Sequence, residues 1–189
     1  ANLNNANLHS AQLAYANLIG ADLSIADLSY ASLFYANLRY ANLTDANLTG
    51  ANLYNADLND ANLIGADLSI ADLSYAGLYD ANLNNANLNN ADLYNANLIY
   101  ANLTGAVQWH TATWAGATYN DATVFPGGMN PEKFGMINVG SIYQYEDCDG
   151  NGTLLLTELD AEPGVNLSGL YLGCANLNDA NLTGANLLG

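Results

Sequence analysis

The segment from Asp147 to Glu158 spaces its oxygen donors as a calcium-binding loop does. Positions one, three and five carry acidic or amide side chains, and Gly152 at position six allows a sharp turn. Calcium takes about six to eight oxygen ligands, which this spacing can gather around one ion. We therefore predict a Ca²⁺ site whose ligands are the side chains of Asp147, Asp149, Asn151 and Glu158 and the carbonyl of Thr153.

This segment resembles the twelve-residue loop of an EF-hand, with Leu154 at the apolar eighth position. The resemblance stops at the flanks, because residues 140–146 are a poor helix and Pro163 soon follows the loop. A lone loop of this kind is more typical of a structural clamp than of a signalling switch. The alternative is a turn rich in Asp and Gly that binds no metal.

Two cysteines, Cys148 and Cys174, are too few for a disulfide scaffold, but an oxidising compartment would allow one bridge between them. The chain begins at Ala1 rather than Met, which predicts that a leader has been removed. Extracellular calcium modules work at about 0.1–1 mM calcium. Together these features predict a secreted, extracellular protein, with the periplasm or thylakoid lumen as alternatives.

The rest of the chain is dominated by a five-residue repeat, Ala-(Asn/Asp)-Leu-x-x, which runs from Ala1 to Gly105. Residues five apart cannot share a face of an α-helix, and in a straight strand they point to opposite faces. Both conflicts disappear if the chain turns a corner in every unit. With right-angled corners, four units close one coil of about twenty residues, and coils stack about 4.8 Å apart. The pattern thus predicts a square β-solenoid filled by Leu and Ala.

The repeat resembles the signature of the pentapeptide-repeat family. That resemblance implies an all-β fold, the right-handed quadrilateral β-helix with four pentapeptides per coil. The Phe-Pro-Gly stretch after the repeats is similar to cyanobacterial members, which favours a cyanobacterial source. The family implies no single activity, since it includes interaction scaffolds and DNA-mimicking gyrase binders.

Breaks in the repeat divide the chain into three stretches. The frame shifts after Gly105 and stops at Pro126-Gly127-Gly128, so we assign residues 1–125 to the β-helix. Residues 126–164 form an insertion that carries the calcium loop at 147–158. The repeat resumes over residues 165–189, which we expect to be coils of the same solenoid.

Large aromatic side chains recur at spacings close to twenty residues, which places them on one face of the predicted coil. Aromatic side chains are frequent in interfaces. The alternatives are that the insertion covers this face or that the rings only form a cross-strand ladder. The aromatic face consists of Tyr15, Phe34, Tyr35, Tyr54, Tyr75 and Tyr94.

Composition excludes several functions. Two basic residues against eighteen acidic ones give a formal net charge of −16, which disfavours binding to nucleic-acid phosphates. No apolar run is long enough to insert into a membrane as a helix. His9 and His110 have no matching nucleophile or ligand set nearby in sequence, so we predict that the protein is not an enzyme.

The leading hypothesis is a structural protein that assembles with itself. Solenoids normally carry polar caps, yet both ends of this sequence are whole repeat units, which favours head-to-tail stacking into a calcium-stabilised filament. The expected joint consists of Asn2, Leu3, Asn7, Leu8, Asn186 and Leu187. The first alternative is a secreted or lumenal scaffold that binds another protein through the aromatic face. The second is a gyrase-binding DNA mimic, against which the many neutral Asn residues count.

Overall fold

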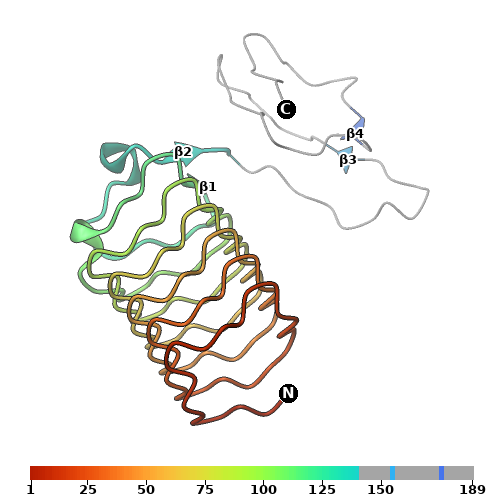
Figure 1. The fold of residues 1–189 in the computed structure, drawn as a ribbon. Helices are drawn as coiled ribbons and strands as arrows, with labels where there is room; N and C mark the ends of the chain where they lie inside the picture. Colours follow the sequence, from red (N-terminus) through yellow and green to blue (C-terminus); the bar gives the residue numbers. More distant parts are fainter. Residues whose placement is uncertain (141–153, 156–174, 177–189) are drawn as a thin grey trace. The chain divides into compact units, whose positions relative to one another are not determined.

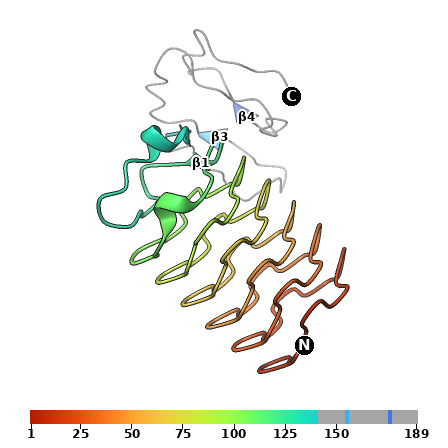
Figure 2. The same ribbon diagram turned by 60° about the vertical axis from the view of Figure 1, so that its left-hand side comes forward.

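The computed structural model describes residues 1–140, 154–155 and 175–176. The chain divides into two compact units, Ala1–Asn138 and Val139–Gly189. In the first unit, parallel β-bridges join each repeat to the repeat twenty residues later, as in Asn2↔Asp22 and Asp22↔Asn42. Four pentapeptides therefore form one coil, and the coils stack in chain order along one axis (Figures 1 and 2).

A pentapeptide between two coils satisfies all five of its backbone N–H groups, as the unit Ala21–Ile25 illustrates. The Asp22 N–H donates to the coil below, at the carbonyl of Ala1 (2.9 Å). The N–H groups of Leu23 and Ile25 donate to carbonyls of the coil above. The N–H of Ala21 closes the preceding turn on the carbonyl of Leu18. The remaining N–H, that of Ser24, donates to the Asp22 carboxylate at 3.2 Å.

The last of these bonds explains why the repeat favours Asn or Asp in its second position. Every such residue from Asn2 to Asn102 accepts the N–H two residues later through Oδ1. A short side chain with an acceptor is needed for this bond, and an unpaired N–H would be costly.

The repeated Leu and Ala side chains fill the centre of the coil. From Leu23 to Leu103 every Leu of the repeat is fully buried, and the Ala residues between them are almost completely buried. Burying one Leu contributes about 1.5–3 kcal/mol, and the coil repeats that gain in every unit. Each unit thus supplies a Leu and an Ala to the core and one turn to the surface, and four units complete one coil around the axis.

The second turn residue of each unit, its fifth residue, usually has a left-handed backbone. Gly and Asn occupy this conformation at low cost, and several units use them. Others place bulky residues there, including Ile25 and Ile70 with φ of 59° and 52°. For a β-branched residue this conformation costs about 1–2 kcal/mol.

We expect the substitution Ile70→Asn to raise the free energy of unfolding by about 1 kcal/mol, because Asn tolerates the left-handed turn. Ile70 is half exposed, so little apolar burial is lost. Ile99 provides the control, since it lies at the first turn position, the fourth residue of its unit, and is buried. Ile99→Asn should destabilise the protein. Chemical denaturation measures both, and a destabilised Ile70→Asn variant would contradict this account of the turn.

The regular coil accommodates extra residues after Ala106. The 3-10 helix η1 (Trp109–Thr111) takes up the first, and bridge partners then lie twenty-one residues apart, as in Asp92↔Thr113. Strand β1 (Thr118–Tyr119) pairs in parallel with β2 (Ile137–Asn138), and the 3-10 helix η2 (Pro131–Phe134) lies between them in the chain. The first unit therefore extends past residue 125, because β2 adds one more pairing after the Pro-Gly-Gly segment.

The second unit is described only at Val139, Gly140 and two short strands. Strand β3 (Leu154–Leu155) pairs in parallel with β4 (Ala175–Asn176). The proposed calcium ligands, both cysteines, and Asn186 and Leu187 lie outside the described residues. So do most of the insertion after residue 140 and most of the resumed repeats.

Candidate functional site

The aromatic residues of the third face, formed by the units that begin at Ala11, Ala31, Ala51, Ala71 and Ala91, make one continuous ladder of rings. Ring centroids are 5.4 Å apart for Tyr15–Tyr35, 5.8 Å for Tyr35–Tyr54, and 5.6 Å for both Tyr54–Tyr75 and Tyr75–Tyr94. Phe34 meets both Tyr15 and Tyr35 edge-on. The structure therefore brings together all six residues of the face inferred from the sequence, and we call them the aromatic ladder.

From Tyr35 to Tyr94 the tyrosines of the ladder alternate between two turn positions, whereas Tyr15 shares the second position with Tyr35. Tyr35 and Tyr75 occupy the second turn position, whereas Tyr54 and Tyr94 occupy the first. Over this stretch, the two tyrosines of each row are forty residues apart, which is two coils. Smaller residues fill the gaps, with Asn55 between Tyr35 and Tyr75 and Ser74 between Tyr54 and Tyr94.

The ladder is accessible along its length. Tyr15 is 67% exposed, Tyr75 is 45% exposed and Tyr54 is 36% exposed. Partial burial raises the pKa of Tyr54, and the neighbouring hydroxyls and the charge of Asp72 add to that effect. The Tyr54 ring therefore remains neutral at ordinary pH and presents both an apolar face and a hydroxyl group.

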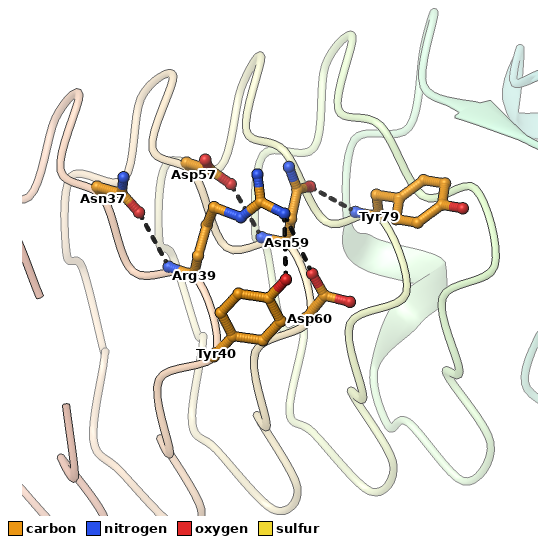
Figure 3. Close-up of polar contacts among 7 residues, drawn as sticks. All are labelled: Asn37, Arg39, Tyr40, Asp57, Asn59, Asp60 and Tyr79. Carbon is orange, nitrogen blue, oxygen red and sulfur yellow. Dashed lines mark hydrogen bonds and ion pairs between the residues drawn. The ribbon is translucent and has the colours of Figure 1, made fainter. Parts of the chain in front are cut away.

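The neighbouring fourth face carries a polar cluster around Arg39 (Figure 3). Arg39 Nη2 lies 3.5 Å from Asp60 Oδ2 and donates to the Tyr40 hydroxyl at 3.4 Å. Its guanidinium carbon lies 5.4 Å from the centroid of the Tyr40 ring. The hydrogen bond with Tyr40 and the nearby Asp57 carboxylate raise the pKa of Arg39, against the effect of burial. This cluster is a partly exposed ion pair between adjacent coils, which stabilises only modestly.

Asn59, also drawn in Figure 3, supplies a hydrogen-bond acceptor that one unit of the repeat lacks. Gly77 occupies the position where Asn or Asp normally accepts an N–H, and it has no side chain to do so. Asn59 Oδ1, from the coil below, accepts the Tyr79 N–H at 2.9 Å instead. A Cβ on Gly77 would lie 3.0 Å from that same Oδ1.

We expect Asn59→Ala to lower the free energy of unfolding by about 1–3 kcal/mol, because the Tyr79 N–H loses this acceptor. Adding Gly77→Asn should recover most of that loss, since the new side chain can accept the N–H as in other units. Gly77→Asn alone should bring no gain, because it crowds Asn59. A double-mutant cycle by chemical denaturation measures the coupling. Additive effects would show that the two residues do not share this role.

The carboxylates of residues 1–140 do not gather on one face. Asp22 and Asp27 lie on the first and second faces, Asp72 lies on the ladder face, and Asp60 and Asp80 lie on the fourth. Burial and the charge of Asp60 raise the pKa of Asp80, whereas a hydrogen bond from Ser29 lowers the pKa of Asp27. A mimic of DNA would need a denser row of carboxylates, so the geometry does not favour that hypothesis.

The two histidines make ordinary local contacts. His9 Nδ1 lies at hydrogen-bond distance, 2.7 Å, from the Ser29 hydroxyl, and His110 lies in η1 against Trp109. Within residues 1–140, no three His, Cys, Asp or Glu side chains are grouped to hold a metal. Over the same part of the chain, no helix is long and apolar enough to cross a bilayer.

The N-terminal half of the expected joint lies on the first coil. Asn2, Leu3, Asn7 and Leu8 belong to its first two units, and each Asn bridges to the second coil. The structure therefore brings these four residues together at one edge.

The pattern of the sequence did not predict the Arg39 cluster or the role of Asn59. Gly77 was the available signal, because it breaks the Asn/Asp position of the repeat. The sequence could not show which neighbouring side chain would compensate, since that depends on how side chains lean between coils.

Comparison with known proteins agrees with this architecture. The family model for pentapeptide repeats matches eight copies, over residues 1–29, 31–69, 71–107 and 164–189. A pentapeptide repeat protein, Rfr23, from the cyanobacterium Cyanothece 51142 is 34% identical, with 58% of this chain and 87% of that chain covered and a TM-score of 0.56. No curated protein matches the chain.

Two further solved structures are similar in sequence. HetL of Nostoc sp. strain PCC 7120, a pentapeptide repeat protein involved in heterocyst differentiation regulation, is 31% identical over 100% of this chain and 70% of that chain, with a TM-score of 0.37. A pentapeptide repeat protein from the thylakoid lumen of Arabidopsis thaliana is 36% identical over 55% of this chain and 68% of that chain, with a TM-score of 0.30.

Proposed function

This chain belongs to the pentapeptide-repeat family, and we propose that it acts without catalysis as a protein-binding scaffold whose docking surface is the aromatic ladder. Proteins of this family adopt the right-handed quadrilateral β-helix and generally serve structural or interaction roles. A solenoid offers extended flat faces, and among those formed by residues 1–105 the ladder face carries the most exposed tyrosines.

One observation supports this proposal above all: three tyrosines of the ladder occupy left-handed turn positions, where they add little net stability to the fold. Tyr15, Tyr35 and Tyr75 have left-handed backbones, with φ of 59°, 57° and 60°. That conformation costs about 1–2 kcal/mol for each residue. Each ring–ring contact returns about 0.5–1.5 kcal/mol, which roughly cancels the cost. Asn or Gly would serve the turn as well without exposing aromatic surface, so a binding role accounts better for the tyrosines.

Selection from a phage-displayed random peptide library tests the proposal. The wild-type chain should enrich peptides that the double variant Tyr35→Asn/Tyr75→Asn fails to bind. These substitutions suit the left-handed turns, so the variant should fold at least as well. The matched control is Tyr30→Asn/Tyr40→Asn, which removes two exposed left-handed tyrosines from other faces. If no peptide distinguishes the ladder variant from the control, the ladder is not a docking surface.

A second candidate function that we propose is end-to-end assembly of the solenoid. Leu3, Leu8 and Leu13 are only partly buried, whereas the equivalent Leu residues of the second coil are fully buried. In such an assembly the coils of one copy would stack on the coils of the next through a heterologous contact.

The proposed joint places Asn186 and Leu187 of one copy against Asn2, Leu3, Asn7 and Leu8 of the next. Negative-stain electron microscopy at micromolar concentration should then show filaments. Replacing Leu3 and Leu8 with Lys should abolish them, because charges would occupy the joint. Monomers of the unmodified chain under the same conditions would rule out this assembly.

We also propose that Asp147, Asp149, Asn151, Thr153 and Glu158 bind Ca²⁺ as a structural ion. The donor spacing supports this site, and an extracellular, periplasmic or lumenal location would supply the ion. Calorimetric titration of the full chain with calcium should show one site, and Asp147→Ala should lose it. Binding heat that Asp147→Ala leaves unchanged would place calcium elsewhere.

A further inference from the structure

We propose that the aromatic ladder binds a basic, proline-rich segment of a partner protein in the polyproline II conformation. This inference rests on the proposed docking function of the ladder and names the class of partner. Three properties of the ladder support it: its period, its chemistry and its charge.

The period of the ladder matches the pitch of a polyproline II helix. Between Tyr35 and Tyr94 the tyrosines form two rows, Tyr35 with Tyr75 and Tyr54 with Tyr94, and the members of each row are two coils apart. Two coils rise about 9.6 Å, since stacked strands lie about 4.8 Å apart. Three residues of polyproline II rise about 9.3 Å. A peptide lying along the solenoid axis with proline at every third residue would therefore meet the same row at each turn.

The alternation of large and small residues gives such a peptide regularly spaced contact sites. Within one row, Asn55 separates Tyr35 from Tyr75, and in the other row Ser74 separates Tyr54 from Tyr94. A ring of the other row lies between the two, with Tyr54 5.8 Å from Tyr35 and 5.6 Å from Tyr75, so proline rings would pack on the exposed edges of the tyrosine rings.

The tyrosine hydroxyls complete the chemistry. A polyproline II helix makes no internal hydrogen bonds, so its carbonyls are free to accept. The hydroxyls of Tyr35, Tyr54 and Tyr75 can donate to these carbonyls because the three side chains are exposed. Partial burial raises the pKa of Tyr54, which keeps its hydroxyl protonated as a donor. The segment is already extended before binding, which lowers the entropy cost of docking on a rigid ladder.

Charge favours a basic segment. Asp72 and Asp92 belong to units of the ladder face, and the Asp72 charge reaches the Tyr54 hydroxyl. The two basic residues of the whole chain, Arg39 and Lys133, lie on the fourth face and in η2. With a formal net charge of −16, the protein attracts Lys or Arg side chains interspersed with the prolines.

The chain offers a control with unchanged composition. The double variant Tyr54→Asn/Asn55→Tyr moves one ring from the first turn position to the second, which puts four tyrosines of successive coils in a single row and removes the two-coil alternation. Asn at the first turn position is used by other repeats, and Tyr already occupies the second in Tyr35 and Tyr75. The variant therefore keeps an exposed aromatic face without the matching period.

Fluorescence anisotropy with the full chain tests the inference. The probe is a labelled peptide of about five Pro-Ala-Arg repeats, spaced at the polyproline II pitch, and the comparison peptide has the same composition with its prolines grouped at one end. The spaced peptide should bind at least tenfold more tightly. Tyr35→Asn/Tyr75→Asn should abolish its binding, Tyr54→Asn/Asn55→Tyr should weaken it about tenfold, and Tyr30→Asn/Tyr40→Asn should leave it unchanged. Circular dichroism and thermal unfolding would verify that each variant is folded.

The outcomes separate this inference from the docking function. Equal binding of both peptides, or binding that the swap leaves unchanged, would overturn the proline period. Ladder-dependent library peptides without spaced prolines would also overturn it while supporting a docking surface. Concentration-dependent self-association that is lost in the ladder variant would make a second copy the occupant and overturn the proline-rich partner. No ladder-dependent binding of any peptide would overturn both proposals.

Discussion

Replacing Leu53 with alanine should lower the free energy of unfolding by about 2–5 kcal/mol, because it opens a cavity that neighbouring coils cannot fill. Leu53 is fully buried in the middle of the first unit. The backbone around it is held by hydrogen bonds to both adjacent coils, so it cannot move inward. Urea denaturation followed by circular dichroism measures the change.

Leu3→Ala provides the matched control for this prediction. Leu3 occupies the same position of the repeat and makes the same backbone bond to the coil above, yet it is only partly buried. It should lose less than half as much stability as Leu53→Ala. Equal losses at the two positions would mean that the first coil is as well packed in solution as the middle of the solenoid.

The second large effect is expected from enlarging an interior alanine. Ala66 is fully buried, and Ala66→Leu would add a branched side chain to a closely packed core. Overpacking of this kind typically costs about 1–3 kcal/mol. A lowered midpoint of thermal unfolding would measure it.

Ala6→Leu is the corresponding control, because Ala6 is partly exposed on the first coil. There the added side chain can extend beyond the edge, so the loss should be small. If Ala66→Leu lowered the midpoint of thermal unfolding no more than Ala6→Leu does, the Ala of the repeat would be a preference of the turn rather than a requirement of the core.

Periodicity predicted the coil well because five-residue spacing is incompatible with a helix or a straight strand. The bridge from Asn2 to Asp22 confirms four units per coil, and the bond from the Ser24 N–H to Asp22 confirms the turn role of Asn and Asp. The aromatic ladder followed from the same arithmetic, since faces repeat every twenty residues.

Other features depended on interactions that spacing does not encode. The pairing of β1 with β2 crosses the Pro126-Gly127-Gly128 segment, which ends the repeat without indicating that the chain returns to pair once more. The left-handed backbone at Ile70 opposes the preference of a β-branched residue and is imposed by the neighbouring coils. Calcium binding, the Cys148–Cys174 bridge and the joint at Leu187 lie outside the described residues and stay predictions.

Because successive pentapeptides satisfy their N–H groups in the same way, the fold does not distinguish one side of the coil from another. The sequence of Ala16–Tyr30 recurs unchanged at Ala61–Tyr75, nine units later, and so arrives a quarter turn further around the axis. Tyr30 lies against Gly50, whereas its duplicate Tyr75 packs between Tyr54 and Tyr94. Copying an odd number of units within such a gene therefore rotates a surface pattern without disturbing the core, and the same residues acquire new neighbours on a new side.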